Sequence, residues 1–125
     1  MVEALKTVVS PEGTAPKAAL DHYTAAGKTG TAQKVENGAY VHGKYVSSFI
    51  GFFPADNPEL CISIVLDEPK EGYYGGMVAG PVFKQVAERA ASYLNIRPDI
   101  EPTNLRNGAV ATAQGTRITG EPGRD

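Results

Sequence analysis

The pattern of apolar positions predicts three extended segments in one antiparallel meander. The first strand is expected at residues 26–35, and the Asn37-Gly38 pair that follows it is a strong signal for a tight hairpin turn. Residues 46–53 and 60–67 carry apolar side chains at both odd and even positions, which is typical of strands covered on both faces. The segment between them has the composition of a turn.

A helix is predicted at residues 78–94, directly after a pair of glycines. Pro81 is tolerated in its first turn. One apolar stripe is expected along this helix, formed by Val78, Val82, Phe83, Val86, Ala90, Tyr93 and Leu94. Residues 1–9 also have helical spacing, and we interpret them as the end of a helix that begins earlier in a longer protein. The predicted fold class is therefore α+β, an antiparallel three-stranded meander with a C-terminal helix.

Two segments have less regular patterns. Residues 40–44 are expected either to continue the hairpin loop or to form a distorted strand start, in which Gly43 permits a bulge. From Arg97 onward, proline and glycine are scattered among polar residues without periodicity. We therefore predict a domain portion at residues 1–98 and a disordered tail or linker at residues 99–125.

Composition narrows the class of function. Apolar residues make up 42% of the 125 positions and the formal net charge is −2, so a soluble globular chain is expected, without the basic surface that nucleic acid requires. No apolar run approaches the ~18 residues that span a membrane. Cys61 is expected to be a buried small hydrophobe. The histidines and the cysteine have no ligand-like spacing, and neither a metal nor a cofactor is predicted.

The candidate chemistry lies in residues 25–33, where small residues surround one cation and two hydroxyls. Lys28 provides positive charge for an anionic group, and Thr29 and Thr31 provide hydrogen-bond donors. Gly30 leaves space for a ligand against the backbone. A surface turn with an incidental lysine is one alternative. A phosphate-binding loop is another, but it needs a glycine five residues before the glycine of its Gly-Lys pair, where His22 stands.

This segment and those after it resemble the penicillin-binding serine transpeptidases, which share a Lys-Thr-Gly element with serine β-lactamases. The resemblance is strongest to the class B enzymes of the division and elongation machinery. It extends over residues 1–99, and the matching segments keep their order and spacing. They are 28–33, 45–55, 65–69, 73–76 and 79–83. The chain thus resembles the C-terminal portion of a β-lactamase/transpeptidase-like domain.

The resemblance implies a role for each residue of the motif. Lys28 would lie near a nucleophilic serine and help to recognise a substrate carboxylate, while Thr29 would orient this lysine. Gly30 and Thr31 would border the ligand, and the Thr31 hydroxyl would donate to the carboxylate of a β-lactam or a stem peptide. The Thr31 backbone N–H would supply half of an oxyanion hole. Tyr73 and Tyr74 are further candidates, because the Tyr-Tyr-Gly-Gly run resembles a family loop beside the cleft.

Two other elements of the family are missing from these residues. The family takes its nucleophile and a base from Ser-x-x-Lys and a further proton-transfer group from Ser-x-Asn. None of the five serines has a lysine three positions on or an asparagine two positions on. The run Thr14-Ala15-Pro16-Lys17 has the spacing of Ser-x-x-Lys, but it carries threonine in place of serine and an interrupting proline. We interpret it as a coincidence. This chain alone is therefore expected to be inactive.

The leading hypothesis is a fragment of a peptidoglycan D,D-transpeptidase. Its parent would cross-link stem peptides, bind β-lactams and be anchored by one N-terminal membrane helix at the periplasmic face of the inner membrane of a bacterial envelope. The alternative is a non-catalytic module that pairs with another chain. One helix covers one face of the predicted sheet, so we expect a partner on the other face, either the remainder of the transpeptidase domain or a second copy.

Overall fold

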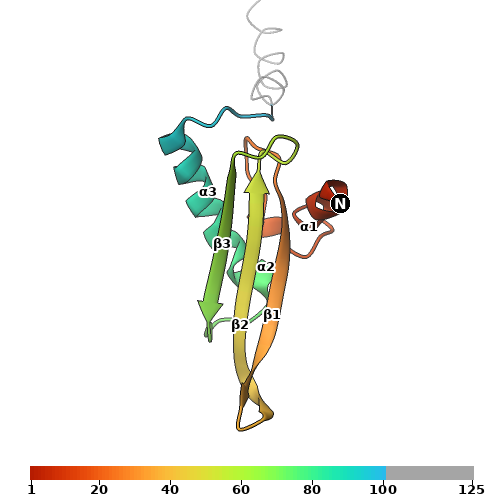
Figure 1. The fold of residues 1–125 in the computed structure, drawn as a ribbon, viewed down its shortest axis with the longest axis vertical. Helices are drawn as coiled ribbons and strands as arrows, with labels where there is room; N and C mark the ends of the chain where they lie inside the picture. Colours follow the sequence, from red (N-terminus) through yellow and green to blue (C-terminus); the bar gives the residue numbers. More distant parts are fainter. Residues whose placement is uncertain (101–125) are drawn as a thin grey trace, which may run out of the picture.

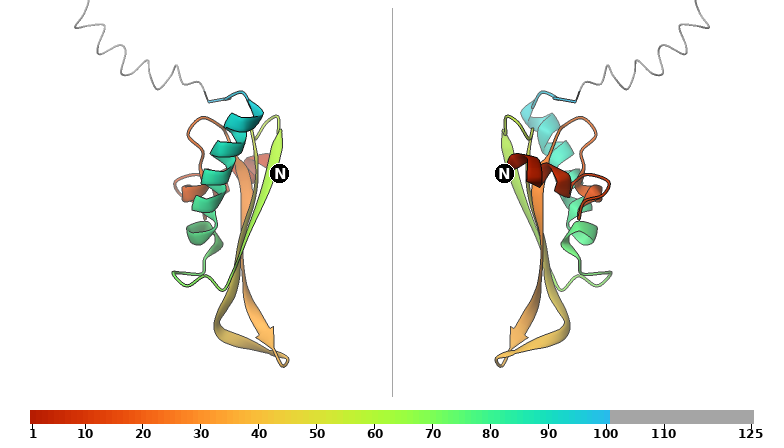
Figure 2. Two further views of the ribbon diagram at one scale, coloured as in Figure 1. Left: turned by 90° about the vertical axis from the view of Figure 1, so that its left-hand side faces the viewer. Right: turned by 90° about the vertical axis from the view of Figure 1, so that its right-hand side faces the viewer.

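The computed structural model describes residues 1–100, in which a twisted antiparallel sheet has its long C-terminal helix on one face and the N-terminal helix beside its first strand (Figures 1 and 2). The strands are β1 (Ala26–Glu36), β2 (Ala39–Phe53) and β3 (Leu60–Asp67), in the order β1-β2-β3. The helices are α1 (Val2–Val8), the short 3₁₀ helix η1 (Pro16–Ala18), α2 (Gly75–Val78) and α3 (Gly80–Leu94). This arrangement confirms the predicted α+β class and the three-stranded meander.

The hairpin between β1 and β2 forms as its sequence predicts. Asn37 and Gly38 both have positive φ, at 52° and 78°, as a tight two-residue hairpin turn requires. Of the two alternatives for residues 40–44, the distorted strand start is correct, because β2 begins at Ala39. The pairing register shifts between Gln33 and Val35, and Gly43 has a φ of 83°. Beyond this bulge the hairpin projects past β3 (Figure 1).

Three phenylalanines form the centre of the core, between the sheet and α3. Phe49 and Phe53 of β2 and Phe83 of α3 are fully buried. The Phe83 ring meets Phe49 edge to face, with ring centroids 4.8 Å apart. Each such side chain stabilises the fold by about 1.5–3 kcal/mol through burial. Because β2 alternates its side chains, this core defines which face of the sheet α3 covers.

The apolar stripe predicted for the long helix is wrong. The helix begins at Gly80, after the separate turn of α2, and its buried residues are Gly80, Phe83, Ala87 and Ala91. Val86 and Tyr93, both placed in the predicted stripe, are 41% and 86% exposed. Small residues face the sheet because they let the helix backbone approach it closely. Of the large side chains in the predicted stripe, Phe83 is buried, whereas Val82, Val86, Tyr93 and Leu94 are exposed.

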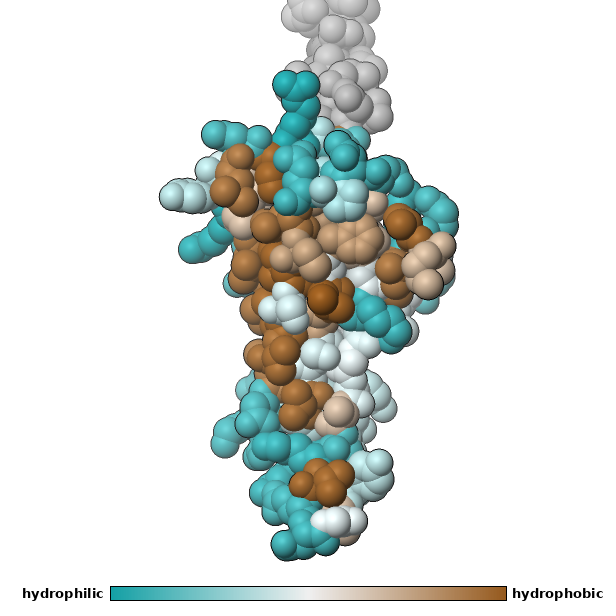
Figure 3. Space-filling model, in the orientation of Figure 1, coloured by the Kyte–Doolittle hydropathy of each residue, from teal (hydrophilic) through white to brown (hydrophobic). Residues whose placement is uncertain are grey.

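The described residues cover only one face of β3, so the coverage on both faces expected for the two apolar strands is not provided within residues 1–100, in line with the expected partner on the other face. Along β3, partly buried and exposed positions alternate strictly. Cys61 is exposed, which corrects its predicted burial, and Val65 is 62% exposed. These side chains, with Ile50 of β2, lie on the face opposite α3. Figure 3 shows this side of the molecule, where apolar surface runs along the strands.

The C-terminal part of the chain is described only to residue 100. Most of the tail predicted at residues 99–125 lies outside the described residues, and its boundary stays a prediction. Within residues 1–100, none of the helices has both the length and the apolar composition needed to cross a membrane.

Candidate functional site

The Lys-Thr-Gly motif lies in the first half of β1, which is an edge strand of the described sheet. Lys28, Thr29 and Gly30 pair with Ile50, Phe49 and Ser48 of β2. No second strand among residues 1–100 pairs with the other edge of β1. An edge strand of this kind presents backbone groups to which an extended peptide can pair.

The strand divides the predicted site residues between its two faces. Thr29 lies opposite Phe49, on the face that α3 covers, and Thr31 follows it on the same face. Lys28 and Gly30 belong to the opposite face. The Lys28 side chain is exposed, and its Nζ donates a hydrogen bond of 2.8 Å to the backbone carbonyl of Thr29. In this conformation the lysine is therefore held by the backbone of Thr29 and not by its hydroxyl.

A glycine pair from a distant segment supports the motif from the α3 side. The backbone N–H of Gly75 donates to Thr31 Oγ1 at 3.0 Å. A Cβ on Gly75 would lie 2.6 Å from the carbonyl oxygen of Gly30 and still nearer to that of Ser48, so no larger residue fits without movement. Since Thr31 Oγ1 accepts from Gly75, its own O–H remains available as a donor.

Thr14 is a site neighbour that the sequence analysis missed. Its hydroxyl lies 3.4 Å from the hydroxyl of Thr29, and its carbonyl closely abuts the backbone of Gly76. The connector around Thr14 therefore contacts both the motif and the glycine pair. No local pattern reveals this, because the contact between Thr14 and Thr29 depends on how the connector folds back over β1.

Tyr73 and Tyr74 lie next to the motif, in a stack with a third tyrosine. Tyr73 stacks on Tyr45 with ring centroids 4.1 Å apart, and it meets Tyr74 at 4.6 Å. Buried Ser47 donates its hydroxyl to the carbonyl oxygen of Tyr73, which holds this loop on β2. The hydrogen bond with Tyr74, followed by the charge of that phenol, raises the pKa of Tyr73. The Tyr73 phenol is therefore neutral at neutral pH.

Two hollows in the described residues differ in whether they touch the motif. A small apolar cavity of about 170 Å³ lies on the open face of the sheet and touches Lys28. Its lining residues are Leu5, Gly27, Lys28, Ile50, Phe52 and Cys61. A larger hollow of about 650 Å³ lies between the connector at Asp21 and the end of α3, and no motif residue lines it. Of these two hollows, only the smaller one touches the motif, at Lys28.

Comparison with known proteins identifies the class to which this fold and site belong. The family model for the penicillin-binding protein transpeptidase domain matches residues 1–88. Over 97 residues the chain is 45% identical to a probable peptidoglycan D,D-transpeptidase, PenA, of Neisseria flavescens, covering 77% of this chain and 24% of that protein. The chain therefore spans about a quarter of the length of this relative.

Solved structures agree with this match. The transpeptidase domain of Burkholderia pseudomallei penicillin-binding protein 3 has a TM-score of 0.72 at 40% identity, covering 80% of this chain and 30% of that one. Penicillin-binding protein 3 of Mycobacterium tuberculosis, solved in complex with ampicillin, has a TM-score of 0.69 at 34% identity. The match covers 81% of this chain and 25% of that one. The chain belongs to the penicillin-binding protein transpeptidase family, and its resemblance to the class B members is confirmed.

Proposed function

We propose that this segment forms one wall of the acyl-transfer site of a peptidoglycan D,D-transpeptidase. The observation that carries the proposal is the arrangement at Thr31. Its side chain projects from an exposed edge strand, and Gly75 holds its hydroxyl oxygen so that the O–H is free to donate. A donor fixed in this way suits the carboxylate of a stem peptide or of a β-lactam.

Each motif residue then has a defined task. Lys28 attracts and orients the carboxylate, and the Thr29 carbonyl accepts a hydrogen bond from the lysine Nζ. Gly30 keeps the strand free of side chains where the substrate backbone approaches, and the Thr31 N–H supplies one oxyanion donor. Tyr73 and Tyr74 would border the substrate beside the motif, and Tyr45 supports Tyr73 by stacking.

The nucleophile comes from a segment that is not among these 125 residues, since they contain neither Ser-x-x-Lys nor Ser-x-Asn. That segment would place its serine near Lys28. The serine oxygen would bond to the substrate carbonyl carbon as the bond between that carbon and the amine nitrogen breaks, and the proton of the serine hydroxyl would pass to the leaving amine. The apolar face around Ile50 and Val65 is the surface it would cover, as the remainder of the same transpeptidase domain. The parent would act at the periplasmic face of the inner membrane, held by one N-terminal helix.

A second candidate function is a non-catalytic module that pairs with another chain. The exposed apolar face and the open edge of β3 favour this alternative, because both are surfaces that an added chain can cover. In that case a second copy of the chain would be the natural partner.

A chimera tests the catalytic proposal. Residues 1–97 of this chain would replace the matching segment of the PenA relative, and acylation by a fluorescent penicillin would be measured. Lys28→Ala and Thr31→Val should each reduce the acylation rate by at least about tenfold, because the first removes the charge and the second the hydroxyl donor that bind the carboxylate. Lys34→Ala, which removes a lysine of the same strand that pairs with Asp67, is the matched control. Acylation that survives both motif variants would contradict the proposal and favour the pairing module.

A further inference from the structure

The residues that follow α3 fold back onto the connector that leads into β1. Asn95 ends the helix with a left-handed backbone (φ 55°), and the N–H of Ile96 bonds to the carbonyl of Ala91 at 2.9 Å. The Tyr23 hydroxyl then donates to the carbonyl of Ile96 at 2.6 Å. We call residues 96–100 the C-terminal strap. Its first residue is buried, so the strap is joined to the core as well as to the connector.

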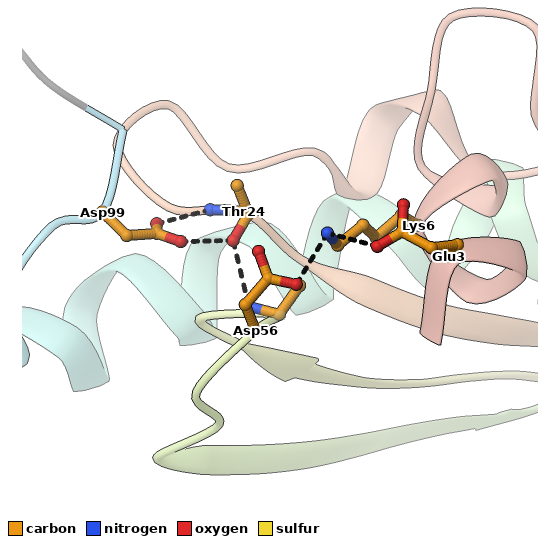
Figure 4. A network of polar contacts seen from close by, with 6 residues as sticks. Glu3, Lys6, Thr24, Asp56 and Asp99 are labelled. Atoms are coloured by element: carbon orange, nitrogen blue, oxygen red, sulfur yellow. Dashed lines mark hydrogen bonds and ion pairs between the residues drawn. The ribbon is translucent and has the colours of Figure 1, made fainter. Parts of the chain in front are cut away.

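The strongest attachment of the strap is Asp99, which binds Thr24 through both carboxylate oxygens (Figure 4). The Thr24 N–H donates to Asp99 Oδ1 at 2.7 Å, and the Thr24 hydroxyl donates to Oδ2. The Ala55 N–H in turn donates to Thr24, at 3.0 Å to its hydroxyl oxygen and 2.9 Å to its carbonyl. Thr24 thus connects the strap with the turn between β2 and β3.

An ion pair also connects this turn with α1. Lys6 forms an ion pair with Asp56 at 2.7 Å and with Glu3 of its own helix at 2.9 Å (Figure 4). Four parts of the chain therefore meet at Thr24: the strap, the connector, the β2–β3 turn and, through the turn, α1. Further along the strap, the Ile100 N–H donates to the carbonyl of His22 at 3.2 Å.

Thr24 is only four residues before Lys28, and β1 begins two residues after it. β1 pairs on one side only, with β2, so its register depends on that pairing and on its end anchors. A slip of one residue would exchange the faces of Lys28 and Thr29. Such a slip would also break the bonds of Thr24 to Asp99 and Ala55. At the other end of the motif, Gly75 holds Thr31.

We infer that Asp99 is a positioning residue, which fixes the register of the motif strand through Thr24 without touching the substrate. The functional consequence rests on the proposed role of the motif: the strap would set where Lys28 and Thr31 meet a ligand. If Asp99 served only to stabilise the whole fold, its loss would raise the amide exchange rates of all the elements together.

Amide hydrogen exchange of the 125-residue chain separates these outcomes. In Asp99→Ala, the protected amides of residues 26–31 should exchange about tenfold faster, because bonds to a charged group are lost at the start of β1. The amides of β3 should change by less than about twofold. The matched control is Lys84→Ala, which removes the 3.1 Å ion pair with Asp21, another link between α3 and the same connector. The control should leave residues 26–31 unchanged.

Two milder variants keep the test decisive if Asp99→Ala fails to fold. Asp99→Asn retains one acceptor, and Thr24→Val removes only the hydroxyl. Each should produce the same local pattern at smaller amplitude, and combining the two should add less than the sum of their effects. Exchange that is unchanged, or that rises equally in β1, β3 and α3, would overturn the inference. The readout involves no substrate, so failure of the chimera experiment would leave it intact.

Discussion

The backbone N–H of Gly75 and the hydroxyl oxygen of Thr31 are 3.0 Å apart, although 44 positions separate them in the sequence. This bond joins the start of α2 to the strand that carries the Lys-Thr-Gly motif. Because the Thr31 oxygen accepts this bond, its O–H remains available as a donor on an exposed part of the strand. The hydrogen-bonding capacity of Thr31 is therefore set by a segment outside the motif.

Gly75→Ala should destabilise the chain by about 1–3 kcal/mol, as overpacked sites do. The new methyl group would meet the carbonyl oxygens of Gly30 and Ser48, which are backbone atoms and move only with the strands. Gly80→Ala is the control, because its Cβ would lie at least 3.4 Å from every neighbour and helix propensity favours alanine. Urea unfolding of both variants measures the difference. Equal stability of the two would show that α2 is not fixed on β1.

The purified chain alone should not be covalently labelled by a fluorescent penicillin. None of its five serines has the lysine or asparagine spacing that the family uses. Denaturing gel fluorescence after incubation measures labelling, with the chimera as the positive control. Labelling that disappears on mutation of any one serine would show a nucleophile within these residues.

The open face of the sheet should make the isolated chain self-associate and bind an apolar dye. Val65 and Ile50 are 62% and 49% exposed on this face. Val65→Thr, which keeps the β-branched shape, should reduce dye fluorescence and the mass seen by light scattering, with a stability change within about 0.5 kcal/mol. Lys44→Thr on the distal hairpin is a surface control. A cooperative monomer without dye binding at micromolar concentration would contradict the expectation.

Removing the Tyr74 hydroxyl should lower the pKa of Tyr73. The hydrogen bond with Tyr74 is the largest cause that raises this pKa above the ordinary value of 10.0. Because the folded-state pKa is raised, the associated stability is present below pH 10 and is lost as the pH rises through the folded-state value. Ultraviolet titration of Tyr74→Phe, with Tyr40→Phe as the exposed control, measures the shift. An unchanged titration of Tyr73 would mean that the pair is not hydrogen-bonded in solution.

Local features of the sequence determined the hairpin, the meander and the position of the motif. Asn37 and Gly38 adopt the left-handed backbone of a tight turn because such residues accept it at little cost, and nothing distant is needed. The strands likewise follow from local composition, and the motif from Lys28 to Thr31 can be recognised from the sequence alone. The prediction of the fold class succeeded for this reason.

Burial and site neighbours were decided only by the tertiary structure. The sequence shows that Cys61 and Val86 are apolar, but which face is covered depends on where α3 crosses the sheet, so both were predicted incorrectly. The same holds for the hydrogen bond between Gly75 and Thr31 and for that between Asp99 and Thr24. Periodicity encodes the local backbone and the side on which a residue projects. The identity of its neighbour depends on contacts between distant segments, which no local pattern specifies.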